Sequence, residues 1–276
     1  MKRRDATLIN DPDPFHSIVP YVMAKRTEAE VSSDITFDIT KLNKFMAQHN
    51  KKEGTQYKLF HAICTAMAKT IYHRPKMNIF ISGRKFWMRN DIILSFVIKQ
   101  KMSDGATETL MTLKVDEDMN LDAISSRILN DVNRVRKEST NDLDKLMNFV
   151  GKLPRPIMEI LFWVIGRMEY HGCVPQSLTE GDPNYTTCLL SNLGSIGADS
   201  CYHHLSNYGT NSIMVTIGTM YKEDKKDLVR CTFTIDERIA DGFYFAKSMR
   251  LVKYLLENPD KLMEPINGDI PENLFD

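Results

Sequence analysis

The sequence has no long hydrophobic run. Its most apolar stretch, Ile157 to Met168, is only about a dozen residues long, whereas a helix that crosses a bilayer needs about 20 consecutive apolar residues. The first residues, Met1 to Asp5, are mostly charged, so they do not look like a secretory signal. We therefore expect neither a transmembrane helix nor a cleaved leader.

An excess of charge of one sign is also missing. The 36 lysines and arginines equal the 36 aspartates and glutamates, so the formal net charge is zero. Proteins that bind nucleic acid or an anionic membrane surface usually carry a basic excess. The sequence therefore predicts no nucleic-acid partner.

Cysteine pairs and glycine-rich nucleotide loops are absent as well. The five cysteines contain no Cys-x-x-Cys spacing, no Walker or dinucleotide glycine loop occurs, and no segment repeats. Scattered cysteines favour reduced thiols in the cytoplasm over a disulfide framework. A length of 276 residues fits a single domain, 1–276. The five cysteines are Cys64, Cys173, Cys188, Cys201 and Cys231.

What is present is an alternation of helical and strand patterns, which predicts an α/β fold. Residues up to about Arg26 contain Pro12, Pro14 and Pro20, which favours an extended segment on the surface. Thr40 and Asn120 are typical N-cap residues of helices. The predicted strands are 35–38, 78–81, 85–88, 92–99, 110–115, 186–190, 213–218 and 228–235, and the predicted helices begin near 40, 59, 121, 143, 157 and 242.

The most informative stretch is the corner between the last strand and the last helix, Asp236 to Gly242. Apolar residues alternate through Val229 to Ile235, and helical spacing begins at Phe245 and ends at Asn258-Pro259. Asp241 can cap the first turn of the helix. The sequence therefore predicts a strand that passes directly into a helix through a charged corner.

This corner resembles a known family. Asp-x-Arg-x-x-Asp-Gly at 236–242, the aromatic-rich helix that ends Leu-Leu-Glu-Asn-Pro, and Ser191-Asn192-Leu193-Gly194 resemble the catalytic domain of the dihydrolipoyl acyltransferases of 2-oxoacid dehydrogenase complexes. Chloramphenicol acetyltransferase shares that fold. Residues 38–42 and 75–78 also look like segments of this family. The resemblance implies a two-layer sandwich of helices on a mixed β-sheet.

The resemblance also implies the site residues. In the family, the second motif residue is the histidine that acts as general base, but here it is Glu237. Ser191 matches the hydroxyl that stabilises the oxyanion, and Asp241 matches a structural support of the corner. Imidazole has an ordinary pKa near 6.5 and glutamate one near 4.3, although burial raises the pKa of a carboxylate. A glutamate in an apolar channel can therefore act as a base.

Two other interpretations of the corner remain open. Glu237 can instead be held in a salt bridge by Arg238 or another cation, and His203 or His204 can supply the imidazole that position 237 lacks. The two adjacent histidines also lie close to Cys201. Neighbouring residues of an extended chain point to opposite faces, so we expect no metal site there.

The resemblance extends to substrates and assembly. It implies a coenzyme A or dihydrolipoyl thioester as substrate, a small-molecule acceptor, and a homotrimer with active sites between subunits. The match covers most of the chain, so we expect no lipoyl domain, no subunit-binding domain and no covalent lipoyl group. The leading hypothesis is an acyltransferase. The alternative is a catalytically inactive trimer that serves as a binding or scaffold protein.

One segment, about 142–178, departs from the family. Residues Ile157 to Met168 are apolar around the whole helix, which favours burial on several sides, in the core or at a subunit interface. A functional interpretation is a lid over the acyl-binding pocket. A third is a patch that rests on a membrane.

Overall fold

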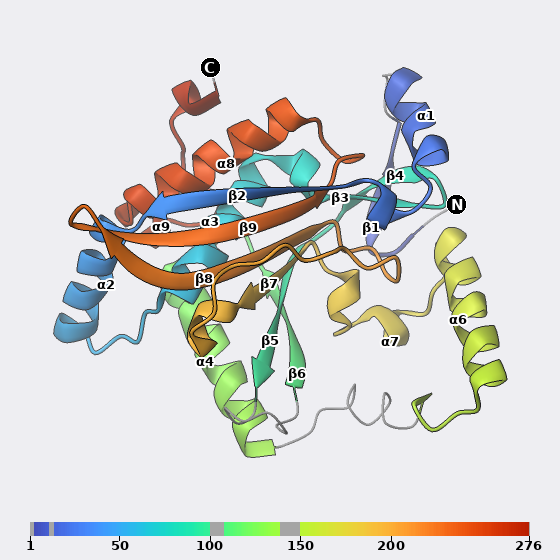
Figure 1. Cartoon of the computed structure of the whole chain (residues 1–276), viewed down its shortest axis with the longest axis horizontal. Helices are drawn as coiled ribbons and strands as arrows, with labels where there is room; N and C mark the ends of the chain where they lie inside the picture. The colour runs from blue at the N-terminus through green and yellow to red at the C-terminus, as the bar shows by residue number, and fades with distance from the viewer. Residues whose placement is uncertain (1–2, 11–13, 100–107, 139–149, 276) are drawn as a thin grey trace.

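The computed structural model describes residues 3–10, 14–99, 108–138 and 150–275. A six-stranded sheet in the order β2-β9-β8-β7-β5-β6 forms its centre (Figure 1). β7 is parallel to both of its neighbours, and the other pairs are antiparallel, so the sheet is mixed as predicted. The strands are β2 (Glu30–Asp38), β5 (Ile92–Lys99), β6 (Glu108–Val115), β7 (Cys188–Asn192), β8 (Ile213–Glu223) and β9 (Lys226–Asp236).

Helices cover one face of this sheet (Figure 1). Residues Cys231, Phe233 and Ile235 of β9 point into a core that these helices complete. α3 lies at the centre of the layer and contacts both α4 and α8. The helices of this layer are α2 (Thr40–Lys52), α3 (Leu59–His73), α4 (Leu121–Glu138), α8 (Gly242–Glu257) and α9 (Asp260–Met263).

The opposite face of the sheet is polar and is crossed by an irregular segment, residues 198–209. On β2 and β9, the hydroxyl groups of Ser32 and Thr234 lie 2.8 Å apart. Tyr202 donates to Asp34 at 2.8 Å, and the hydroxyl of Thr216 donates to the carbonyl of Cys201 at 2.7 Å. The architecture is therefore the predicted two-layer sandwich, with helices on one side only.

A second, three-stranded sheet has the order β1 (Ala6–Ile9), β4 (Lys85–Arg89), β3 (Ile79–Ser82). The β3–β4 hairpin turns at Gly83 and Arg84, whose φ angles are 58° and 59°. Positive φ at both central residues is the requirement of the tight hairpin turn that matches strand twist. The hairpin lies where the sequence predicts it.

The N-terminal prediction is wrong for the part that contains Pro14 and Pro20. Residues Ala6–Ile9 are extended, in β1, but the chain then forms helix α1 (Pro14–Val22) and a short 3-10 helix, η1 (Arg26–Glu28). Pro14 lies at the start of α1, where a helix needs no backbone N–H donor, and the fixed φ of proline suits a helix. The prolines therefore did not exclude a helix here.

The predicted N-cap at Thr40 is also wrong. Ile39 is the N-cap residue, and Thr40 is the first residue of α2. The Thr40 hydroxyl accepts a hydrogen bond from the backbone N–H of Asp227 at 2.9 Å. The hydroxyl of Thr40 therefore contacts the start of β9 and does not cap the helix. Asn120 does cap α4, because its side-chain oxygen accepts from Ala123 N–H at 3.1 Å.

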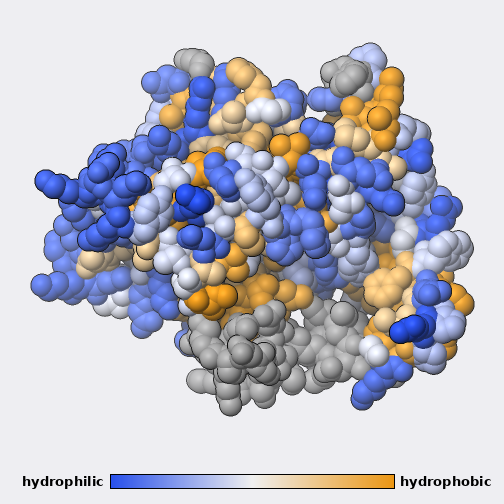
Figure 2. Space-filling model, viewed as in Figure 1, coloured by the Kyte–Doolittle hydropathy of each residue, from blue (hydrophilic) through white to orange (hydrophobic). Residues whose placement is uncertain are grey.

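The apolar helix α6 (Arg155–Tyr170) is not a core helix. None of its residues is buried, and Ile160 and Trp163 are 63% and 67% exposed. Figure 2 shows hydrophobic surface along α6 and over α1. Within the described residues, no helix is both long and apolar enough to span a membrane. The helix predicted near 143–150 lies almost entirely outside the described residues.

The remaining elements are short helices. They are α7 (Gln176–Thr179), η2 (Pro75–Asn78), η3 (Pro183–Tyr185), η4 (Leu193–Ile196) and η5 (Glu272–Phe275). η4 directly follows β7, so the Ser-Asn-Leu-Gly motif spans the end of a strand and the start of a tight turn. This junction places the motif at the C-terminal end of β7, an inner strand of the sheet.

Candidate functional site

The corner between β9 and α8 is built as predicted. β9 ends at Asp236, and α8 begins at Gly242. The carboxylate of Asp241 accepts a hydrogen bond from Tyr244 N–H at 2.7 Å, which caps the helix. The negative charge also lies at the positive end of the helix dipole. Asp241 therefore has a structural role.

Asp236 and Arg238 form a fully buried ion pair at this corner. Arg238 donates through Nε and Nη2 to the two carboxylate oxygens of Asp236, both at 2.7 Å, and through Nη1 to the carbonyl of Met23 at 2.8 Å. Arg26 Nε lies 3.8 Å from the same carboxylate. The interpretation that Arg238 holds Glu237 in a salt bridge is therefore wrong, because its guanidinium is engaged by Asp236.

Glu237 itself is exposed. Its backbone N–H donates to the carbonyl of Ala29 at 2.8 Å, which continues the pairing of β2 with β9. Glu237 is the first residue of the turn that follows β9, and its side chain is exposed whereas those of Asp236 and Arg238 are buried. The apolar channel that the hypothesis requires around this carboxylate is not formed within a single chain.

Ser191 lines a cavity of about 310 Å³ at the end of β7. The cavity lies between the start of α3, one side of α4, strand β5 and the Ser-Asn-Leu-Gly turn. Lys58 is exposed at this cavity, and Ser191 is half-buried. We call this space the Ser191 pocket, and its lining is mostly apolar: Phe60, Phe96, Val97, Ile98, Ile128, Leu129, Val132, Leu193 and Ile196, with the polar residues Lys58, His61, Ser191, Asn192 and Ser195.

Ser191 and Glu237 lie far apart in the chain's own sheet. The register pairs Ser191 with Thr216 and Thr216 with Thr232, and Glu237 follows Thr232 by five residues. At about 3.3 Å per residue and about 4.8 Å per strand, the two Cα atoms are separated by about 19 Å. A base and an oxyanion donor that act on one reacting group must lie within hydrogen-bond reach of it. One chain therefore does not bring these two residues together.

His203 and His204 do not lie at the Ser191 pocket. Both are exposed, and their Nδ1 atoms lie 2.8 Å and 3.3 Å from the backbone carbonyls of His204 and Leu205. Neither lines that pocket. That one of them supplies the imidazole that position 237 lacks stays a prediction. In the part of the chain that the structure describes, no group of three His, Cys, Asp or Glu side chains could hold a metal ion.

The histidine that does line the Ser191 pocket is His61. It is 2% exposed, and its Nδ1 lies 2.7 Å from the hydroxyl of Ser125 on α4. Burial, with a smaller effect of the Lys58 charge, lowers the pKa of His61 to about 4, so the imidazole is neutral at neutral pH. His61 could not be singled out from the sequence, because no neighbouring residue marks it as part of a site.

The low pKa of His61 predicts that the protein loses stability as the pH falls. Because the pKa is about 4 in the folded chain and near 6.5 in the unfolded chain, the unfolded state binds the proton first as the pH falls. Stability present above pH 6.5 is therefore lost between about pH 6.5 and 4, by about 3 kcal/mol. Between pH 7 and pH 4, the free energy of unfolding should therefore fall by about 3 kcal/mol less in His61→Asn than in the wild type. Urea denaturation at pH 7 and at pH 4 measures this difference.

The matched control for this prediction is His203→Asn, which removes an exposed imidazole. It should follow the wild-type dependence on pH. Comparing each variant with the wild type cancels the effect of acid on the carboxylates, which all three proteins share. An identical pH dependence in His61→Asn and the wild type would refute the assignment.

Comparisons with solved structures identify the fold. No family model and no curated protein matches the sequence. A probable dihydrolipoamide acetyltransferase from Listeria monocytogenes is similar at a TM-score of 0.59 and 16% identity, over 91% of this chain and 95% of that one. A truncated catalytic core of the 2-oxoacid dehydrogenase complex from Thermoplasma acidophilum has a TM-score of 0.59 and 12% identity, over 92% and 100%. A chloramphenicol acetyltransferase has a TM-score of 0.53 and 13% identity, over 91% and 99%. The chain therefore has the fold of dihydrolipoamide acetyltransferase catalytic cores and of chloramphenicol acetyltransferase.

Proposed function

We propose that this protein is an acyltransferase that moves an acyl group from a coenzyme A or dihydrolipoyl thioester to a small acceptor. The observation that carries the proposal is the position of Ser191, which lies in a mostly apolar pocket at the end of β7. The similarity in fold to two kinds of acetyltransferase supports it. Fold alone does not establish activity, so the argument depends on the site.

The Ser191 pocket suits a thioester. Phe60, Phe96 and Ile128 provide apolar walls for an acyl chain or a pantetheine arm. Lys58 is exposed at the same pocket and carries a positive charge that attracts the phosphates of coenzyme A. Sites for such ligands are usually apolar clefts with a few polar groups that fix the orientation.

In the proposed reaction, Glu237 first accepts a proton and later donates it. Glu237 accepts the proton of the acceptor's hydroxyl, amine or thiol as that atom attacks the thioester carbonyl. The Ser191 hydroxyl donates a hydrogen bond to the oxyanion that develops on the carbonyl oxygen. The carbon–sulfur bond then breaks, and Glu237 returns the proton to the departing thiolate.

The proposed assembly is a homotrimer in which Ser191 of one subunit faces Glu237 of the next. Two observations support it: about 19 Å separate the residues within one chain, by the strand spacings given above, and Glu237 is exposed. Head-to-tail contacts that close into a ring bring unlike surfaces of neighbouring copies together. Such a contact would also remove water from Glu237, as a carboxylate base requires.

The test is acyl-thioester consumption by mixed assemblies. We expect Glu237→Gln to lose about 10²-fold or more in rate, because the amide cannot accept the proton. Refolding Glu237→Gln with Ser191→Ala in a 1:1 mixture should restore about a quarter of the wild-type activity, because one in four interfaces then pairs intact residues. The single variants alone are the controls, and mixtures as inactive as the single variants would contradict a shared site.

A second candidate function is a catalytically inactive trimer that binds ligands or serves as a scaffold. The glutamate at the position of the family's histidine favours it, because Glu237 lies in solvent in the single chain. Binding of coenzyme A without turnover of any acyl-thioester by the wild type would favour this candidate. Turnover that depends on Ser191 would exclude it.

The proposal places the reaction in the cytoplasm. All five cysteines are free, and two of them, Cys173 and Cys201, are exposed. Exposed free thiols fit a reducing compartment better than an oxidising one.

The roles of α6 as a subunit contact or as a membrane contact remain predictions. Its C-terminal half lines a cavity other than the Ser191 pocket, so a lid over that pocket is not supported.

A further inference from the structure

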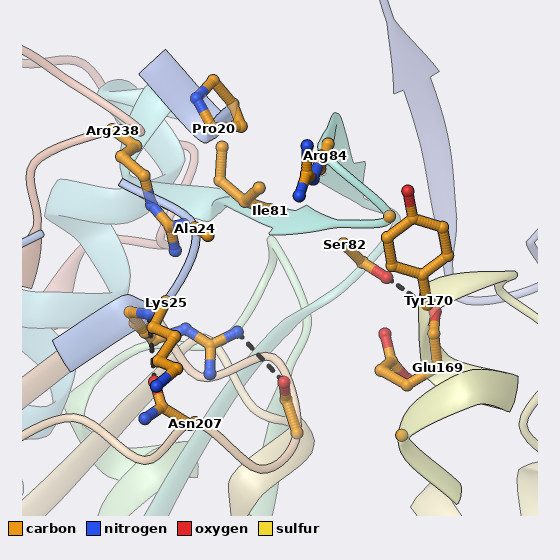
Figure 3. Close-up of a pocket in the computed structure, with 14 residues that line it drawn as sticks. Pro20, Ala24, Lys25, Ile81, Ser82, Arg84, Glu169, Tyr170, Asn207 and Arg238 are labelled. Carbon is orange, nitrogen blue, oxygen red and sulfur yellow. Dashed lines mark hydrogen bonds between the residues drawn. The ribbon is translucent and has the colours of Figure 1, made fainter. Parts of the chain in front are cut away.

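A second cavity, of about 280 Å³, has Arg238 in its wall (Figure 3). Its wall combines five segments that are distant in sequence: the end of α1 with η1, the β3–β4 hairpin, the C-terminal half of α6, residues 207–209, and Arg238 after β9. Neither Ser191 nor Glu237 lines it. We call it the arginine pocket, and the inference below is independent of the proposed acyl transfer.

The arginine pocket carries an excess of positive charge. Four cationic side chains and one carboxylate line it. Arg238 and Arg26 share one carboxylate partner, Asp236, at 2.7 Å and 3.8 Å. The cations are Lys25, Arg26, Arg84 and Arg238, and the carboxylate is Glu169.

Arg26 is a buried donor that is not fully satisfied. It is 5% exposed, and its two terminal nitrogens donate to neutral carbonyls, those of Ser206 and of Gly209. Its Nε makes no hydrogen bond within the described residues, is itself buried, and lies 3.8 Å from the carboxylate of Asp236 as a long ion pair. Arg26 therefore contributes a buried positive charge to the wall of the cavity.

Lys25 and Arg84 add two exposed charges to the same pocket. No carboxylate of the described residues lies within ion-pair distance of either side chain, although the Arg84 guanidinium lies 4.7 Å from the ring centre of Tyr21. In Figure 3, both side chains come from different walls of the cavity. Together with Arg26 they form a group of cations that an anionic ligand would neutralise.

Glu169 is the carboxylate of the pocket wall. One of its carboxylate oxygens accepts from Arg3 at 2.7 Å, and the other is buried and has no partner within the described residues. The side chains of Pro20 and Ile81 and the ring of Tyr170 give the same pocket apolar surface, which suits a small organic body.

We propose that the arginine pocket binds a small organic anion, a carboxylate or a phosphate ester. Its charged group lies among Lys25, Arg26 and Arg84, and its body packs against the apolar wall. Arginine and lysine bind both anions through charge-assisted hydrogen bonds. The charge and volume of the pocket therefore indicate a small anion. The experiment below distinguishes a carboxylate from a phosphate ester.

The test uses three probes of similar shape: phenyl phosphate, benzoate and the neutral benzamide. Titrations of the full-length protein, followed by calorimetry or by amide chemical shifts, measure each dissociation constant. We expect saturable binding of at least one anion, at least about tenfold tighter than benzamide. Binding of benzoate alone identifies a carboxylate ligand, and binding of phenyl phosphate alone identifies a phosphate ester.

Two variants locate the site. Arg84→Asn removes a charge but retains a residue that tolerates the positive φ of that position, and we expect about tenfold weaker anion binding. Lys25→Gln removes a second charge without disturbing the contact between Arg84 and Tyr21, and it should weaken binding to a similar extent. The matched control is Lys85→Asn, because Lys85 is exposed on the same hairpin but does not line the pocket.

Three results would overturn the proposal. They are an absence of saturable binding for both anions, equal affinity for benzamide, and anion affinities that neither Arg84→Asn nor Lys25→Gln changes relative to Lys85→Asn. Melting temperatures of the three variants show whether each is folded. Acyl-transfer activity is measured separately, since its presence or absence does not bear on this pocket.

Discussion

Asp236→Ala should reduce the free energy of unfolding by about 3–5 kcal/mol, the cost of removing one partner of a buried ion pair. Asp236 is fully buried and accepts two hydrogen bonds from the guanidinium and one from the backbone N–H of Arg238, which is itself 3% exposed. Without the carboxylate, the guanidinium of Arg238 and that of nearby Arg26 remain buried without a counter-charge. The loss therefore reflects mainly the cations that are left behind rather than the strength of the pair.

The adjacent residue provides the control. Glu237→Ala removes a carboxylate one position away, but that side chain is exposed, so we expect a change within about 0.5 kcal/mol. Urea denaturation at pH 7 and one protein concentration measures both variants, because the stability of an assembled protein depends on concentration. Replacing the pair together, in Asp236→Leu with Arg238→Met, should recover part of the loss. Equal stability of Asp236→Ala and the wild type would contradict the account.

Ser191→Ala should lower the rate of acyl transfer by about 10²- to 10³-fold, the usual effect of removing one oxyanion donor. This prediction depends on the proposed function. Because the donated hydrogen bond strengthens only as charge develops on the oxygen, the loss should be in kcat, with little change in KM. Steady-state kinetics with a panel of acyl-thioesters measures both constants.

Ser195→Ala is the matched control. Ser195 lines the same pocket and belongs to the same turn, but its hydroxyl already donates to the carbonyl of Asn192 at 2.7 Å. We therefore expect its rate to stay within about threefold of the wild type, well below the effect of an oxyanion donor. Equal losses in the two variants would indicate a general effect on the turn, and no loss in either would remove Ser191 from the mechanism.

The elements around the corner could be predicted because their signals are local. The period of two in β9 and the helical spacing in α8 each follow from contacts with one neighbouring layer. The cap at Asp241 depends on residues within one turn, so it is also readable. The same reasoning explains why α3, α4 and the β3–β4 hairpin lie where the sequence predicts them.

The ion pair at the corner could not be predicted from the period of β9. The strand ends at Asp236, and the chain then turns, with Ile239 N–H donating to the carbonyl of Asp236 at 3.1 Å. This turn brings Arg238 back to Asp236 and leaves Glu237 exposed. The strand period therefore did not decide which carboxylate Arg238 pairs with.

The N-terminal helix and the environment of α6 could not be predicted in this way. Proline content suggested an extended segment, but α1 packs at the arginine pocket and its first proline suits a helix start. The apolar composition of α6 suggested burial, but composition does not say whether the covering surface belongs to the same chain. Both errors concern contacts made with distant parts of the molecule.

By itself, the sequence determined the order and type of the main elements, the capped corner, and the chemical character of Ser191 and Glu237, because each depends on residues close in the chain. Only the tertiary structure decided that His61 lines the Ser191 pocket, that Ser191 and Glu237 lie at opposite ends of the sheet, and that Arg26 and Arg84 share a cavity. The physical reason is that a pocket forms where distant segments converge. Burial, charge and distance at that place depend on packing between layers, which no local period encodes.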